Sequence, residues 1–148
     1  MKHITVEANI DNLDKIMDFV NAELELKGFP ADSVPDIDVA VEEIFLNISS
    51  YAYEPAENPP KDGRLGLLSQ APSGDVTLFV NVGEEAMLQF VDTGKPFNPL
   101  EAPAPDLDKP LMERDIGGLG IAFVKQLMDD VTYTYVGAQN MLTIIKRR

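Results

Sequence analysis

Cysteine is absent from this sequence of 148 residues, and histidine occurs once, as His3 at the N-terminal edge. The absence of cysteine excludes disulfides and metal sites built from thiolates. A single histidine leaves almost no residues for a phosphohistidine relay or for a metal site with several histidines. We therefore expect neither cysteine chemistry nor a site built from several histidines.

Basic residues are also scarce. Twelve lysines and arginines stand against 25 aspartates and glutamates, which gives a formal net charge of −13. Such an acidic surface repels phosphate backbones and anionic lipids, so direct binding to nucleic acid or to a membrane is not expected. A nucleotide is not excluded, because backbone N–H groups and Mg²⁺ can hold phosphate even on an acidic protein.

Long apolar runs are missing as well. The longest ones are far shorter than a membrane span. Residues 1–7 alternate like a strand and lack the apolar stretch of a signal peptide, so we expect a cytoplasmic protein. The apolar fraction of 45% is ordinary for a folded protein, and the length fits a single domain over residues 1–148.

Alternating apolar residues predict strands, and apolar residues three and four apart predict helices. The predicted strands cover residues 2–8, 76–82, 88–92, 131–136 and 140–147, with a hairpin turn at Gly83-Glu84 and Gly137 between the last two. The predicted helices begin after Asn9 or Asp11, after Asp32 or Ser33, where the helix runs to about Tyr53, and near Gly118. Residues 64–70 fit either a short strand or part of a long loop.

Residues 98–116 contain four prolines and mixed charge, which is typical of a mobile loop. This loop is either a lid over a ligand or a solvent loop. The predicted order is strand, two helices, two or three strands, loop, helix and two strands. Consecutive strands joined by tight turns pair antiparallel, and one helical layer on one sheet predicts an α+β sandwich.

The pair Glu43 and Asn47 lies four residues apart and therefore on one face of the second predicted helix. Asn47 borders the apolar stripe, where an amide must find partners or line a cavity. Its carbonyl oxygen is a suitable ligand for Mg²⁺, and a carboxylate one turn earlier could deprotonate a hydroxyl. Taken alone, the pair fits a solvated helix face better than a catalytic site.

The segment from Asp92 to Phe97 follows the end of a predicted strand. Alternation places Asp92 on the face of Leu88 and Phe90, where a buried carboxylate needs hydrogen-bond donors. The exocyclic amino group of adenine is such a donor, whereas guanine presents an acceptor there, so this aspartate would select ATP over GTP. Alone, the segment is equally an ordinary Asp-Thr-Gly turn.

A glycine-rich stretch, Gly117-Gly118-Leu119-Gly120, opens the third predicted helix. Glycines let a backbone approach phosphates, and a helix N-terminus supplies free N–H donors and the positive end of a dipole. The alternative is a flexible hinge before a helix. The sequence contains neither the P-loop pattern nor a dinucleotide-binding pattern after a strand.

Together and in this order, the three segments resemble the GHKL superfamily of ATP-binding domains, which includes gyrase, MutL, heat-shock chaperones and histidine kinases. The closest resemblance is to the anti-sigma-factor serine/threonine kinases. It rests on residues 41–47 (VEEIFLN) with 51–53 (YAY), 90–99 (FVDTGKPFNP) and 117–121 (GGLGI), and it covers nearly the whole chain. It implies a Bergerat-type, two-layer α/β sandwich with a mixed, mostly antiparallel sheet covered on one face by helices.

The resemblance also implies roles for individual residues. Glu43 would be the general base, Asn47 the Mg²⁺ ligand, and Asp92 with Gly94 would hold adenine. The stretch from Gly117 to Gly120 would contact the phosphates, and Thr143 matches a family threonine near adenine. Arg114, the only arginine in the expected lid, is a candidate contact of the γ-phosphate. Related kinases often carry a basic residue where Tyr51 stands, and the loop over residues 55–74 is longer than the family leads us to expect.

The function implied is that of an ATP- and Mg²⁺-dependent serine/threonine protein kinase that phosphorylates a small anti-sigma-factor antagonist. A sigma factor would be the other partner, and a homodimer is compatible with this family. Two alternatives share the fold. One is a regulatory module that binds ATP and holds a partner without phosphorylating it, and the other is an ATPase with water as the acceptor.

Overall fold

The computed structural model describes residues 1–52, 74–101 and 116–148. Five strands form one sheet: β1 (Lys2–Glu7), β2 (Asp75–Val82), β3 (Glu85–Asp92), β4 (Asp130–Val136) and β5 (Gln139–Arg147). Their order in the sheet is β1-β2-β3-β5-β4, and every neighbouring pair is antiparallel. The described strands therefore form an antiparallel sheet, in agreement with the mostly antiparallel sheet that the family resemblance implied.

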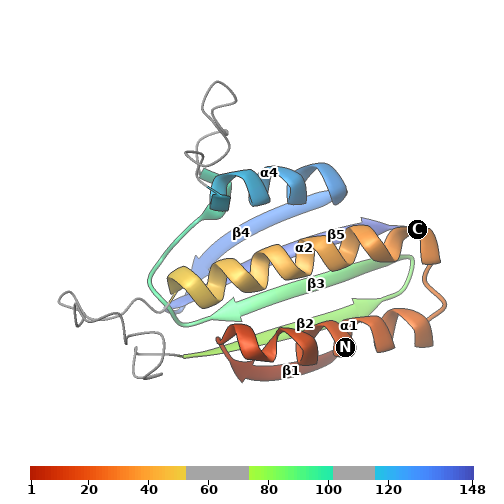
Figure 1. The fold of residues 1–148 in the computed structure, drawn as a ribbon, viewed down its shortest axis with the longest axis horizontal. Coiled ribbons are helices and arrows are strands. Elements are labelled where there is room, and N and C mark those ends of the chain that lie inside the picture. Colours follow the sequence, from red (N-terminus) through yellow and green to blue (C-terminus); the bar gives the residue numbers. More distant parts are fainter. Residues whose placement is uncertain (53–73, 102–115) are drawn as a thin grey trace.

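In the described part of the chain, three helices lie over one face of this sheet: α1 (Leu13–Leu26), α2 (Val34–Asn47) and α4 (Ile116–Leu127) (Figure 1). In Figure 1, α2 runs between α1, on the β1 side, and α4, on the β4 side. This arrangement confirms the predicted two-layer α+β sandwich. None of the helices in the described ranges has the length and hydrophobicity that a membrane span needs.

A short 3₁₀ turn precedes each of α1 and α2. Ile10–Asn12 precede α1 as one 3₁₀ turn, and the side chain of Asn9 caps this turn by accepting a hydrogen bond of 2.9 Å from the Asp11 N–H. A second 3₁₀ turn leads into α2, which holds Pro35 in its first turn, where a missing N–H costs nothing. The α-helical part of α2 ends at Asn47, earlier than predicted, and one π turn continues to Ala52.

The core lies between the helices and the sheet. Side chains from α1, α2, α4, β2, β3 and β5 fill it, and the largest fully buried ones are Phe45, Phe90, Ile16, Leu24, Ile37, Ile44, Leu78, Leu88 and Ile144. On β2, and on β3 as far as Phe90, the buried residues alternate with more exposed ones, so each strand turns one face to the helices. Because successive side chains alternate in this way, every second residue of β3 and β5 faces the helices.

Candidate functional site

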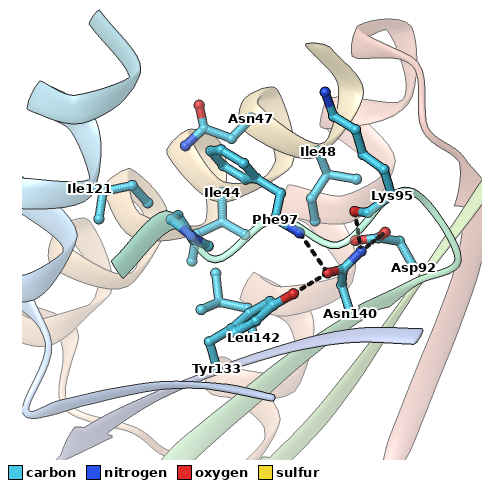
Figure 2. A pocket seen from close by; sticks show the side chains of 11 residues that line it. Ile44, Asn47, Ile48, Asp92, Lys95, Phe97, Ile121, Tyr133, Asn140 and Leu142 are labelled. Atoms are coloured by element: carbon cyan, nitrogen blue, oxygen red, sulfur yellow. Dashed lines mark hydrogen bonds between the residues drawn. The ribbon is translucent and has the colours of Figure 1, made fainter. Parts of the chain in front are cut away.

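An open pocket lies where the C-terminal end of α2 meets the ends of β3 and β4 and the start of β5. Its empty volume, including the solvent-filled mouth, is about 450 Å³. The described lining residues are Ile44, Asn47, Ile48, Asp92, Lys95, Phe97, Pro99, Ile121, Tyr133, Asn140 and Leu142 (Figure 2). The lining is mostly apolar with a few converging polar groups, which is the usual make-up of a small-molecule site.

Asp92 ends β3 and is 5% exposed. Its Oδ1 atom accepts two hydrogen bonds of 2.9 Å, one from the Gly94 N–H and one from the Asn140 Nδ2. Among the described residues, Oδ2 accepts no hydrogen bond. One oxygen of this pocket-lining carboxylate therefore remains free to accept a hydrogen bond from a ligand.

Burial raises the pKa of Asp92 above its ordinary value of 3.8. The hydrogen bonds from Asn140 and from the Gly94 N–H act in the opposite direction, because they stabilise the charged form. The two donors thus offset part of the desolvation cost of an ionised carboxylate in this position.

Asn140 is the polar centre of the pocket, and it was not predicted from the sequence. It is 5% exposed and sits directly opposite Asp92 in the β3–β5 register. Its Nδ2 also donates to the Lys95 carbonyl at 2.9 Å and lies 3.3 Å from the Gly94 carbonyl. Its Oδ1 accepts from the Phe97 N–H at 3.2 Å and from the Tyr133 hydroxyl. Asn140 therefore ties the loop after β3 to the sheet.

Asn47 and Glu43 occupy one face of α2, one turn apart. Asn47 lines the pocket, as the sequence analysis expected, whereas Glu43 does not appear among the lining residues. Glu43 is half-buried, and burial, together with the nearby charge of Glu42, raises its pKa above the ordinary value of 4.5. Glu42 itself is exposed.

The glycine-rich stretch opens a helix, as the sequence predicted. Residues 116–120 form the first turn of α4. Ile121, in the next turn, lines the pocket. The N-terminal end of α4, with its free N–H groups, therefore lies close to the pocket.

Thr143 lies on the opposite face of the sheet from the pocket. Asn140, Leu142 and Ile144 are the buried positions of β5, so Thr143 points away from the helices. There it pairs with Gln89, whose Nε2 donates to its Oγ1 at 3.2 Å. The expectation that Thr143 lines the adenine site is therefore corrected, and Asn140 holds the pocket-facing position on this strand.

Three predicted features fall outside the described residues: most of the expected lid at 98–116, Arg114, and the loop at 55–74. The first residues of the expected lid are described. Pro99 is buried against the pocket, and the Lys125 Nζ donates to the Leu100 carbonyl at 3.3 Å. Asn98 accepts a hydrogen bond of 2.9 Å from the Leu100 N–H. The segment that leaves the pocket is therefore attached to α4.

The fold and the pocket define a small α+β ligand-binding domain with one face of a sheet covered by helices. A comparison with protein families matches residues 6–146 to the histidine kinase-like ATPase domain. Because this match spans nearly the whole chain, the chain belongs to that family and is an ATP-binding domain of the GHKL type. No curated protein matches the chain.

Proposed function

We propose that this domain is a cytoplasmic kinase that binds Mg-ATP in the pocket and transfers the γ-phosphate to a serine or threonine hydroxyl of a partner regulatory protein. The observation that carries the proposal is the pairing of Glu43 with Asn47 on one face of α2, with Asn47 in the same pocket as Asp92. The pocket thus supplies an acceptor for adenine and an oxygen ligand, and a half-buried carboxylate lies one helical turn before that ligand.

Adenine would be held at the Asp92 end of the pocket. The free Oδ2 of Asp92 can accept a hydrogen bond from the exocyclic amino group of adenine. Apolar side chains of the lining, such as Ile44, Ile48 and Leu142, would contact the ring. Guanine carries a carbonyl oxygen at this position, which would face the carboxylate oxygen and be rejected.

The phosphates would extend from adenine toward Asn47 and the N-terminal end of α4, where the helix dipole favours negative charge. Within residues 1–52, 74–101 and 116–148, no cluster of three acidic or histidine side chains could hold a metal ion alone. This fits Mg²⁺, which commonly keeps several waters and uses one or two protein ligands together with phosphate oxygens. Asn47 would supply that ligand, and the ion would neutralise charge on the phosphates.

Glu43 would act on the attacking hydroxyl. As the hydroxyl oxygen forms its bond to the γ-phosphorus, the bond from that phosphorus to the bridging oxygen of ADP breaks, and Glu43 takes the hydroxyl proton. The raised pKa of Glu43 makes its carboxylate a better proton acceptor near neutral pH than an ordinary glutamate. Glu43 would reach this position once the acceptor and the nucleotide are both bound.

The resemblance to anti-sigma-factor kinases supports a small anti-sigma-factor antagonist as the phosphorylated partner and a sigma factor as the second partner. The alternatives are an ATP-dependent binding module without transfer, and an ATPase. Incubation with γ-labelled ATP, with and without the candidate partner, distinguishes them. Label on the partner supports the kinase, free labelled phosphate supports the ATPase, and tight ATP binding with neither product supports the binding module.

A further inference from the structure

The geometry points to Asn140 as the residue that sets the base specificity of the pocket, by holding Asp92 with Oδ1 saturated and Oδ2 presented to the ligand. This role rests on the proposed function, because it presupposes that adenine binds at Asp92. Asn140 would not touch the reacting atoms, so it is a positioning residue.

The orientation of the Asn140 amide follows from its neighbours. On one side lie two donors, the Phe97 N–H and the Tyr133 hydroxyl, which need an acceptor (Figure 2). On the other side lie acceptors, namely the Lys95 carbonyl and Asp92 Oδ1, each 2.9 Å from Nδ2. A flipped amide would set N–H against N–H and oxygen against oxygen. The amide therefore has one stable orientation, with its donor toward Asp92.

This fixed donor constrains Asp92 in two ways. Because Asn140 and the Gly94 N–H both donate to Oδ1, rotation of the carboxyl group would break two hydrogen bonds in a buried place. Because a protonated Oδ1 would face these two donors, they also favour the ionised form. An ionised Asp92 offers only acceptors, which suit the amino group of adenine and oppose the carbonyl of guanine.

Few titratable side chains surround Asp92 in the described part of the pocket. The titratable side chains that line the pocket with it are Lys95 from the same loop and Tyr133 from β4. From α2 the described lining residues are Ile44 and Asn47, and α4 contributes Ile121, none of which titrates. Tyr133 already donates to Asn140, so it supports Asp92 through that amide.

The experiment measures the dissociation constants of Mg-ATP and Mg-GTP by calorimetry for the wild type, Asn140→Asp, Asp92→Asn and the double variant. Asn140→Asp keeps the shape and the acceptor oxygen but removes the Nδ2 donor. The matched control is Asn81→Asp, which adds the same charge on an exposed side chain of β2, at the end of the sheet away from Asp92.

We expect Asn140→Asp to reduce the preference for ATP over GTP by about tenfold or more. The new oxygen repels Asp92 Oδ1 where Nδ2 had donated, so the Asp92 carboxyl group is no longer held in place and can take up a proton on Oδ2 that donates to guanine. Asn81→Asp should leave the preference unchanged. In the Asp92→Asn background, the Asn140 substitution should no longer alter it, because the carboxylate that Asn140 positions is gone.

An Asn140→Asp protein that binds ATP and GTP more weakly by the same factor would overturn this role and leave only a structural one. If Asn140→Asp does not fold by circular dichroism, Asn140→Leu removes the donor without adding charge, and the same loss of preference is expected. A folded Asn140→Leu with the wild-type preference would also overturn the role. A wild type that binds neither nucleotide would instead overturn the proposed function on which the role rests.

Discussion

Asn140 on β5 and Asp92 on the neighbouring strand β3 stand directly opposite each other, and the Asn140 Nδ2 donates a hydrogen bond of 2.9 Å to the Asp92 Oδ1. Both side chains are 5% exposed. A buried carboxylate is costly unless donors satisfy it, and here the donors reach one oxygen and leave the other for a ligand. One oxygen of Asp92 is therefore occupied by protein donors, and the other can accept from a ligand.

Asp92→Asn should weaken ATP binding and improve GTP binding relative to ATP. The amide Oδ1 can still accept from the Gly94 N–H and from Asn140, so the fold should persist. The new Nδ2 would then face the pocket and oppose the amino group of adenine, at a cost of about tenfold or more in ATP affinity. Calorimetry with both nucleotides checks this. Unchanged ATP affinity in a folded variant would remove Asp92 from the site.

The pH dependence of stability should report the burial of Asp92. Its pKa is raised above 3.8 in the folded protein, so between these two values the folded state binds more protons than the unfolded state. The contribution of Asp92 to the free energy of unfolding is therefore full below pH 3.8 and declines as the pH rises through the raised pKa. Asp92→Asn removes this decline, so urea unfolding of the two proteins should differ more at pH 7 than at low pH.

ATP affinity should increase with pH over the range in which the contribution of Asp92 to the free energy of unfolding declines. Adenine recognition uses ionised Asp92, so affinity should fall as the pH drops through the raised pKa of this group. Calorimetric titrations between about pH 4.5 and 7.5 can follow this change. Asp92→Asn should bind weakly with a flat profile in this range. A wild-type affinity that increases toward low pH would contradict the assignment of Asp92.

Asn47→Ala should abolish metal-dependent nucleotide binding and leave the fold largely intact. Asn47 lines the pocket and is only partly buried, so removing its amide deprives the metal of its protein ligand without opening the core. The measurement is ATP affinity with and without Mg²⁺, with Asn81→Ala as the control. If circular dichroism finds Asn47→Ala unfolded, Asn47 is better explained as a structural hydrogen-bonding residue.

Ala138→Gly should stabilise the protein. Gly137 and Ala138 form the two-residue turn between β4 and β5, and both have a φ of 61°. This left-handed conformation is costly for alanine and free for glycine, so after the greater freedom of glycine in the unfolded chain we expect a gain of about 0.5 kcal/mol. Ala22→Gly, on an exposed position within α1, should instead destabilise by about 1 kcal/mol. Equal losses in urea unfolding would contradict the strained turn.

The sequence predicted the sandwich and part of the site for clear physical reasons. On β2 the valines and Leu78 alternate with polar or aromatic residues, and on β3 Asp92 has the same parity as Leu88 and Phe90, so the face of Asp92 could be assigned before the structure was known. Asn47 could be placed because helical periodicity fixes its face relative to Ile44. Glu43 shares that face, but periodicity alone could not indicate how far its side chain lies from the pocket.

The faces of the β5 side chains could not be assigned in the same way. Its residues 141–145 read MLTII, which is apolar at positions of both parities, so alternation did not distinguish the face of Thr143 from that of Asn140. Asn140 also follows the Gly137 turn closely and resembles a turn residue. Its function depends on the long-range register that sets it opposite Asp92, which a local pattern does not contain.

Glu43→Gln tests the proposed kinase most directly. The measurement is the single-turnover rate of transfer from γ-labelled ATP to the partner, together with ATP affinity. Glu42→Gln is the matched control, because Glu42 is exposed and is rotated about 100° around α2 from Glu43. We predict that Glu43→Gln keeps ATP affinity within a few-fold and loses roughly 10²–10⁴-fold in transfer rate, while Glu42→Gln transfers like the wild type. Transfer at the wild-type rate by a folded Glu43→Gln protein would contradict the proposed role of Glu43.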